Sequence, residues 1–236
     1  MITGVLHKIR DELQCNADPE TVKITQRFFK KPIRAYGIKT PTVKWVAKKY
    51  SKEMKEWNCR EVLDLCTELW KDGYLEESII ACELSLFLEK SFELADFQIF
   101  EFWLTNFVDN WAACDGLCNH TVGAFVSRYP HYLNHLKRWT LSENRWLRRA
   151  AAVSLIIPAR KGRFLDDIFQ IADSLLEDKD DLVQKGYGWM LKAASEAHER
   201  QVFEYVIGKK DRMPRTALRY AIEKMAPDLR KKAMER

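Results

Sequence analysis

The chain has 236 residues, of which 47% are hydrophobic and 31% charged, and its formal net charge is +5 at pH 7. This composition excludes a disordered or fibrous chain, and the length is sufficient to bury one sizeable core. No apolar run approaches the roughly 20 residues that cross a bilayer, and the first ten residues lack the features of a secretion signal. We therefore expect one cytoplasmic domain spanning residues 1–236, without membrane association.

Apolar residues recur with helical spacing in several parts of the chain. Residues 2–13 place Ile2, Val5, Leu6, Ile9 and Leu13 on one face, and segments 80–88 and 164–175 repeat the pattern. No segment alternates with the period of two that a strand requires. These observations predict amphipathic helices throughout.

Four prolines indicate where helices begin, because a first helical turn does not need the N–H that proline lacks. In addition, Ser142 before Glu143 is a predicted N-cap. A helix running through residues 150–156 is predicted to end at Pro158 and Gly162. The four prolines are Pro19, Pro41, Pro214 and Pro227.

A dozen or more short helices with short links favour stacked helix pairs over one bundle of long helices. No motif recurs at a fixed period, so the repeats would be degenerate, and an irregular helical domain is the alternative. The predicted fold class is all-α, as an α-solenoid of HEAT-like helical repeats.

Charge is segregated along the chain. Residues 23–55 hold eleven Lys or Arg against one acid, 128–163 hold nine against one, and 208–236 hold ten against four. Residues 56–127 hold three against fourteen, and 164–207 hold four against ten. Since a solenoid brings equivalent edges of its repeats together, the basic blocks could line a concave face suited to duplex DNA, with the acidic blocks facing elsewhere. For any single block, a solvated helix face is the alternative.

Six cysteines in a chain of this length without secretory features predict reduced thiols. Cys114, Cys118 and His120 are close in sequence, but they lack the second ligand pair of a structural zinc site. We expect no disulfide, no metal and no cofactor. The remaining cysteines are Cys15, Cys59, Cys66 and Cys82.

Trp111 and Asp115 are four residues apart, which puts both side chains on one face of a helix. Taken alone, such a pair is more often a packed tryptophan beside a surface or capping aspartate. By the same reasoning Arg149 is a surface arginine of its basic block, and Trp189 is a core residue.

Three segments together resemble the AlkD family of DNA alkylation repair glycosylases: Asn110–Asp115 (NWAACD), Glu143–Ala151 (ENRWLRRAA) and Gln184–Leu191 (QKGYGWML). Tyr36–Pro41 (YGIKTP) and the stretch from Leu69 to Lys90 are further matches. The resemblance covers nearly the whole chain in the same order.

This resemblance implies a HEAT-like solenoid that cups double-stranded DNA and removes N3- or N7-alkylated purines. A solenoid that grips one duplex needs only one copy of the chain, so we expect a monomer, and DNA binding would place it at the nucleoid. Asp115 would be the catalytic carboxylate, with Trp111 and Trp189 as aromatic partners at the deoxyribose of the lesion. Arg149 would contact the DNA backbone. Three further residues are expected at the DNA, of which the first is a looser match: Phe28, Arg148 and Lys185.

A single carboxylate is consistent with this chemistry. Glycosidases commonly use two, one of which protonates the leaving group. A purine alkylated at N3 or N7 is already cationic and departs neutral without a general acid. Asp115 would then stabilise an oxocarbenium-like sugar and orient water, as a monofunctional alkylpurine DNA glycosylase.

Three other interpretations remain open. The first is a non-catalytic HEAT-like repeat protein that binds DNA. The second is a helical scaffold for other proteins, which the basic blocks disfavour. The third is a lyase that forms a Schiff base, for which Lys185 is the candidate amine.

Overall fold

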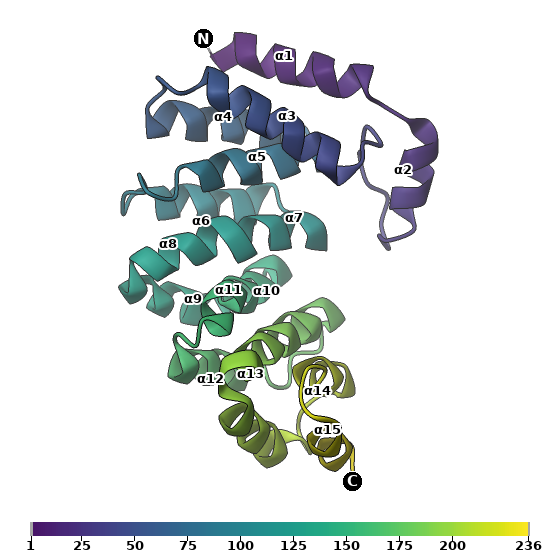
Figure 1. Ribbon diagram of the computed structural model, residues 1–236, viewed down its shortest axis with the longest axis vertical. Coiled ribbons are helices and arrows are strands. Elements are labelled where there is room, and N and C mark those ends of the chain that lie inside the picture. The colour runs from purple at the N-terminus through teal and green to yellow at the C-terminus, as the bar shows by residue number, and fades with distance from the viewer. Residues whose placement is uncertain (1, 236) are drawn as a thin grey trace. The chain divides into compact units, whose positions relative to one another are not determined.

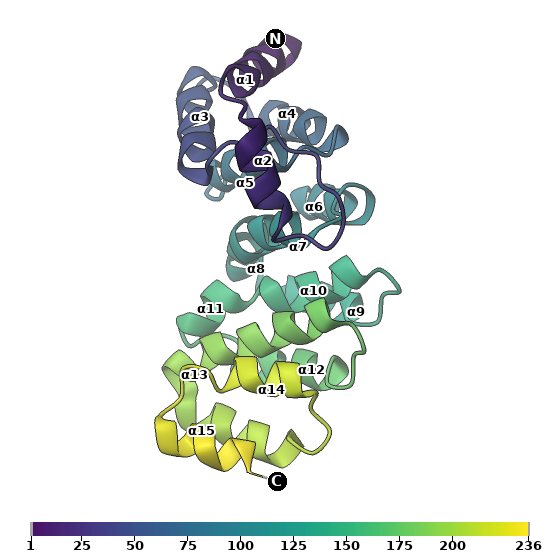
Figure 2. The same cartoon turned by 90° about the vertical axis from the view of Figure 1, so that its right-hand side faces the viewer.

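The computed structural model describes residues 2–235, and this part of the chain is helical, without a strand (Figures 1 and 2). A single isolated parallel bridge joins Arg34 and Tyr74. The chain divides into two compact units, Met1–Leu117 and Cys118–Arg236, which are described in turn. Within residues 2–235, no helix combines the length and apolarity that a membrane-spanning segment requires.

Unit 1 stacks its helices in two layers. Helices α3, α5 and α7 contact one another in that order, α4 packs on α5 and α6, and α1 covers α3 and α4. Helix α2 is joined to α3 by the non-helical segment 27–39. The helices are α1 (Ile2–Cys15), α2 (Pro19–Gln26), α3 (Thr40–Glu53), α4 (Cys59–Lys71), α5 (Leu75–Phe87), α6 (Asp96–Asn106) and α7 (Trp111–Gly116).

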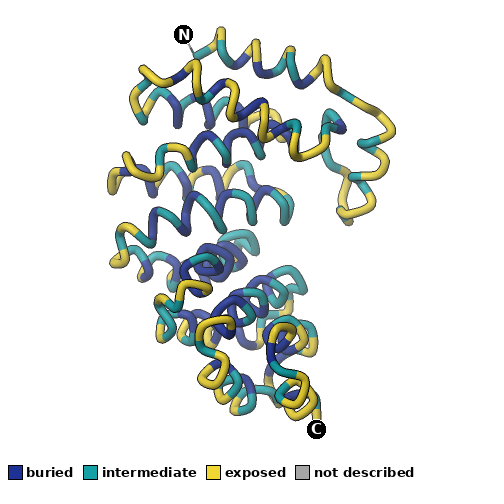
Figure 3. Tube along the Cα trace, in the orientation of Figure 1, coloured by how far each residue is buried: buried dark blue, intermediate teal, exposed yellow. Residues whose placement is uncertain are grey.

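The core of unit 1 lies between these layers. Leu63, Leu69, Ile80 and Phe100 are fully buried, and Trp103 joins them while its indole N–H donates to Thr67 Oγ1 at 3.0 Å. Figure 3 shows the buried positions along the facing sides of α3, α4 and α5, whereas α2 and the segment after it are largely exposed. Burial of these apolar side chains is the main stabilising contribution.

Unit 2 is organised around α13, its longest helix, which packs against α10, α11, α12 and α14. This helix is kinked at His198, whose φ of −135° and ψ of 48° are not helical. The elements are η1 (Leu117–Val122, a π-helical turn that begins at the last residue of unit 1), α8 (Gly123–Arg128), η2 (Pro130–Tyr132), α9 (Leu133–Trp139), α10 (Arg145–Val153), α11 (Ile156–Arg160), α12 (Leu165–Ser174), α13 (Asp181–Lys209), α14 (Arg215–Ala221) and α15 (Pro227–Met234).

The predicted all-α class is confirmed, and stacked helices with short links within each unit are the arrangement of an α-solenoid. Proline marks helix starts as predicted: Pro19, Pro41 and Pro227 lie in the first turns of α2, α3 and α15, and Pro214 is the N-cap of α14.

Two boundary predictions are wrong. Helix α10 is capped by Asn144, whose Oδ1 accepts the N–H of Trp146 at 2.8 Å, while Ser142 Oγ accepts the N–H of Asn144 at 3.1 Å. The helix through residues 150–156 ends at Val153, and Pro158 lies inside α11. Pro158 is the third residue of α11, where a backbone N–H has no intrahelical partner to lose.

Candidate functional site

The predicted Trp111–Asp115 pair lies on α7, as its spacing indicated. Asn110 caps this helix, because its Oδ1 accepts the N–H of Ala113 at 3.0 Å. Trp111 is the first helical residue and Asp115 follows one turn later, and both are half-buried. The π-helical turn η1 begins two residues after Asp115, and such turns are frequent at functional sites.

Trp111 rests on the segment that follows α2. Its indole N–H donates to the carbonyl oxygen of Phe28 at 3.3 Å, across 83 residues of sequence. The ring stacks on Phe29, with centroids 5.4 Å apart and planes inclined by 18°. The Phe28 side chain itself is 69% exposed. The structure therefore brings Phe28, one of the predicted DNA contacts, to Trp111.

Phe29 was not predicted from the sequence, although its position beside Phe28 was a signal. Two adjacent aromatic residues in a polar, basic segment outside any helix cannot both be explained by a helical core face. One of them presents its ring to solvent and the other packs against the candidate site.

In unit 2, Arg149 on α10 is buried, with 5% of its surface exposed, and is not the surface arginine of the simpler interpretation. Its guanidinium donates to the carbonyl oxygen of Leu182 at the start of α13. Gly186, one turn further along α13, makes room for it: a Cβ there would lie 3.3 Å from Arg149 Cγ. Burying a guanidinium raises the free energy of the folded state unless it is hydrogen-bonded. The Leu182 carbonyl supplies a hydrogen-bond acceptor, and Gly186 leaves the space.

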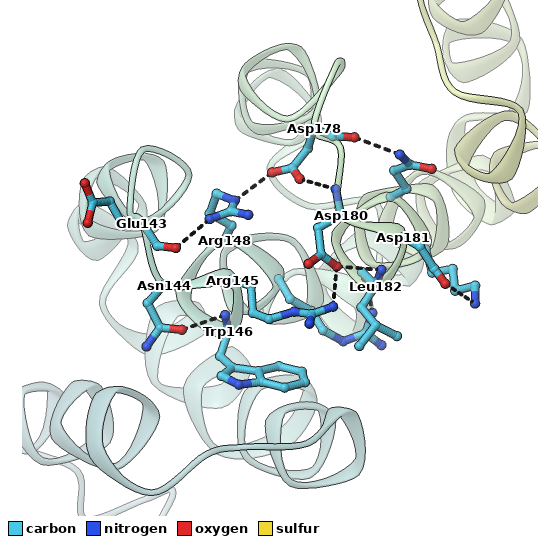
Figure 4. Close-up of polar contacts among 12 residues, drawn as sticks. Glu143, Asn144, Arg145, Trp146, Arg148, Asp178, Asp180, Asp181 and Leu182 are labelled. Carbon is cyan, nitrogen blue, oxygen red and sulfur yellow. Dashed lines mark hydrogen bonds and ion pairs between the residues drawn. The ribbon is translucent and has the colours of Figure 1, made fainter. Parts of the chain in front are cut away.

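Two further basic residues form ion pairs near the start of α13, Arg148 with the turn that precedes this helix and Lys185 within the helix (Figure 4). Arg148 Nε lies 2.7 Å from Asp178 Oδ2, and Arg148 also donates to the carbonyl oxygen of Glu143 at 2.9 Å. Lys185 Nζ lies 2.9 Å from Asp181 Oδ2. Both predicted DNA contacts are thus engaged within the protein.

Trp189 lies on α13, one turn after Lys185, and is half-buried rather than a full core residue. The adjacent Gly188 faces α14 closely, because a Cβ there would lie 2.7 Å from Tyr220 Cβ. This close packing fixes the rotation of α13 about its axis and therefore the direction in which Trp189 projects.

The charge blocks are less separated in space than in sequence. In unit 2, four basic side chains of residues 128–163 pair with acids of residues 164–207, so the expectation that acidic blocks face elsewhere does not hold for them. The pairs are Lys137–Asp167, Arg145–Asp180, Arg148–Asp178 and Arg160–Glu196, at 2.6, 2.6, 2.7 and 3.4 Å.

The six cysteines are free thiols. In the described range 2–235, no three His, Cys, Asp or Glu side chains gather in a way that could hold a metal ion.

The fold and these residues define a class: an all-helical protein of stacked helices that presents tryptophans, a carboxylate and a buried arginine. The profile of the DNA alkylation repair enzyme family matches residues 9–225. The chain belongs to this family, which confirms the resemblance drawn from its three sequence segments. It is thus a DNA repair enzyme by family.

A solved structure titled as a predicted DNA alkylation repair enzyme from Enterococcus faecalis has the same fold. The match has a TM-score of 0.80 and 20% sequence identity, and it covers 90% of this chain and 98% of the other. No curated protein matches the chain.

Proposed function

We propose that this protein is a monofunctional DNA glycosylase that hydrolyses the N-glycosidic bond of cationic N3- or N7-alkylated purines in duplex DNA. One observation carries the proposal. Trp111 and Asp115 share one helix of a DNA alkylation repair family member, and the Trp111 ring is fixed by Phe28 and Phe29. The carboxylate and the aromatic ring are therefore preorganised one helical turn apart.

The proposed chemistry needs no general acid. An alkylated purine leaves as a neutral base, and the barrier lies in forming an oxocarbenium-like sugar. The Asp115 carboxylate stabilises the positive charge that develops there and orients the attacking water. The reaction thus consumes one water and yields the free alkylpurine, an abasic sugar and a proton, which is lost from the attacking water.

The tryptophans of the site bind and orient the DNA. In unit 1, the Trp111 ring faces the sugar cation, and such a cation–π contact contributes about 0.5 to 2 kcal/mol, depending on desolvation. In unit 2, Trp189 is the second aromatic residue that we assign to the DNA. Arg149 is buried and donates to the carbonyl oxygen of Leu182, so its part is to orient the start of α13 rather than to present its guanidinium at the surface.

Replacement of the carboxylate tests the assignment. Asp115→Asn keeps the size of the side chain and removes its charge, so the release of 7-methylguanine should fall by roughly 10² to 10³-fold. Mass spectrometry of free bases released from methylated duplex measures this. The matched control is Asp64→Asn, which breaks the exposed ion pair to Arg60 on α4 and should leave release unchanged, because exposed pairs contribute little. Near-normal release by Asp115→Asn would overturn the proposal.

The same assay separates the alternatives. Uracil and hypoxanthine should not be released, since they are neutral and nothing in the proposed site protonates them. A wild-type protein that binds duplex but releases no base would be a non-catalytic DNA-binding protein. A borohydride-trapped DNA adduct would favour a lyase, with Lys185 as the candidate amine.

A further inference from the structure

Segment 27–39 has no regular structure, yet a buried carboxylate holds it. Glu76, the second residue of α5, is 2% exposed. Its Oε2 accepts the N–H of Tyr36 at 2.9 Å, and its Oε1 accepts the N–H groups of Gly37 and Ile38 at 2.8 and 3.0 Å. A buried charge is tolerated when it is hydrogen-bonded, and three backbone donors meet that need.

A second buried carboxylate reinforces the same point. Glu77, which is fully buried, accepts the hydroxyl of Tyr36 at 2.7 Å and the guanidinium of Arg10 at 2.8 Å. Burial, followed by the hydrogen bond to Glu77, raises the pKa of Tyr36, so the phenol keeps the proton that it donates. The middle of the segment is therefore anchored to α5 by both backbone and side chain.

Gln26 organises the turn that carries the two phenylalanines. Its side-chain amide donates to the carbonyl oxygens of Phe29 at 3.2 Å and Lys31 at 2.9 Å, and its Oε1 accepts the N–H of Ile33 at 3.0 Å. The Gln26 side chain therefore hydrogen-bonds backbone groups along the whole turn, from Phe29 to Ile33. Ordering these residues costs conformational entropy, and a segment that is already held in place meets this cost on folding rather than on binding DNA.

We propose that Glu76 and Gln26 are positioning residues for Trp111. They hold segment 27–39, and this segment holds the indole through the Phe28 carbonyl and the Phe29 ring. The inference rests on the proposed function, because it assigns Glu76 and Gln26 a role in placing the Trp111 ring of the proposed excision site. A small displacement of a positioned group can cost a reaction up to two orders of magnitude.

A double-mutant cycle tests the proposal. Glu76→Gln puts an amide N–H donor opposite the backbone N–H donors. Gln26→Ala removes the side-chain contacts of the turn at a half-buried position. Each should slow single-turnover release of 7-methylguanine by about tenfold, with duplex Kd changed less than threefold. When Trp111→Ala is already present, each substitution should slow release by less than a further twofold, because Glu76 and Gln26 act through the Trp111 ring.

Asp96→Asn is the matched control. Asp96 is also a buried carboxylate of unit 1, 8% exposed, and accepts the N–H of Glu93 at 2.8 Å, away from segment 27–39. This variant should lower thermal stability and leave the release rate unchanged. Effects of Glu76→Gln and Gln26→Ala that are fully additive with Trp111→Ala, or wild-type rates in both folded variants, would overturn the proposal.

A spectroscopic arm separates this inference from the proposed function. Subtracting the emission of Trp111→Phe from that of its parent isolates Trp111 among the eight tryptophans. The difference spectrum should shift in Glu76→Gln and in Gln26→Ala without any DNA. Should the wild type release no alkylpurine, the proposed function fails, and this spectrum still decides the positioning role. An unchanged spectrum in both variants would overturn it.

Discussion

Gly37 illustrates how a single residue sets the course of segment 27–39. Its φ is +84°, which L side chains rarely adopt, and an ideal Cβ would lie 2.1 Å from the carbonyl oxygen of Asp18. The N–H of Asp18 in turn donates to the carbonyl oxygen of Tyr36 at 3.0 Å. Only glycine allows the start of α2 and the anchored part of the segment to approach this closely.

Gly37→Ala should therefore lower the free energy of unfolding by at least about 2 kcal/mol, since backbone strain and a steric clash act together. Urea unfolding followed by circular dichroism measures this. Gly73→Ala is the matched comparison: its φ is +67°, but nothing lies within 4 Å of the added Cβ, so only the cost of the backbone conformation applies. An equal loss in both variants would contradict the steric argument.

At the scale of one element, α3 separates a buried face from a basic one. Val43, Val46, Ala47 and Tyr50 pack inward. Lys44 and Lys49 on the other face pair with Glu83 and Glu12, both at 2.7 Å. The same exposed face carries Trp45, which is 57% exposed, together with Lys48 and Lys52, for which the described residues provide no ion pair. We predict that Lys48 and Lys52 contact the phosphates of bound duplex.

Removing two of these charges should weaken duplex binding. Lys48→Gln combined with Lys52→Gln should reduce the slope of log K against log salt by about 1 for each phosphate that the variant no longer neutralises, without sequence preference. Fluorescence anisotropy of a labelled duplex measures the slope. The control is Lys71→Gln on α4, whose ammonium pairs with Glu68 at 2.5 Å. A slope that changes as much in the control would refute the assignment of this face.

At the scale of the whole molecule, the net charge of +5 understates the local contrast, and the ion pairs within unit 2 reduce the number of cations available for DNA. Affinity for duplex then depends on the basic side chains that have no acidic partner. The distribution of paired and unpaired cations, rather than their total, should set the response to salt.

Duplex affinity should accordingly fall by about 10³-fold between 50 and 200 mM salt, the change expected for six phosphate contacts. Titration of undamaged duplex at the two concentrations measures it. A helical scaffold for other proteins would bind DNA weakly and with little response to salt. An affinity that changes less than tenfold would favour that scaffold over a DNA-binding enzyme.

Much of the local structure follows from the sequence alone. The apolar spacing of residues 2–13 predicted α1, proline marked the start of α2, and the four-residue interval put Trp111 and Asp115 on one helix. These features depend on backbone geometry and on steric effects within one or two turns, which are the same wherever the helix lies.

Only the tertiary structure decided what Trp111, Glu76 and Arg148 contact. Phe28 reaches Trp111 across 83 residues, Glu76 binds backbone groups about 40 residues earlier, and Arg148 pairs with an acid of the next charge block. The charge pattern along the chain could not anticipate such pairs, because helix packing brings residues together regardless of their separation in sequence. The sequence determined the helices and the candidate Trp111–Asp115 pair, whereas long-range packing decided how Trp111 is held.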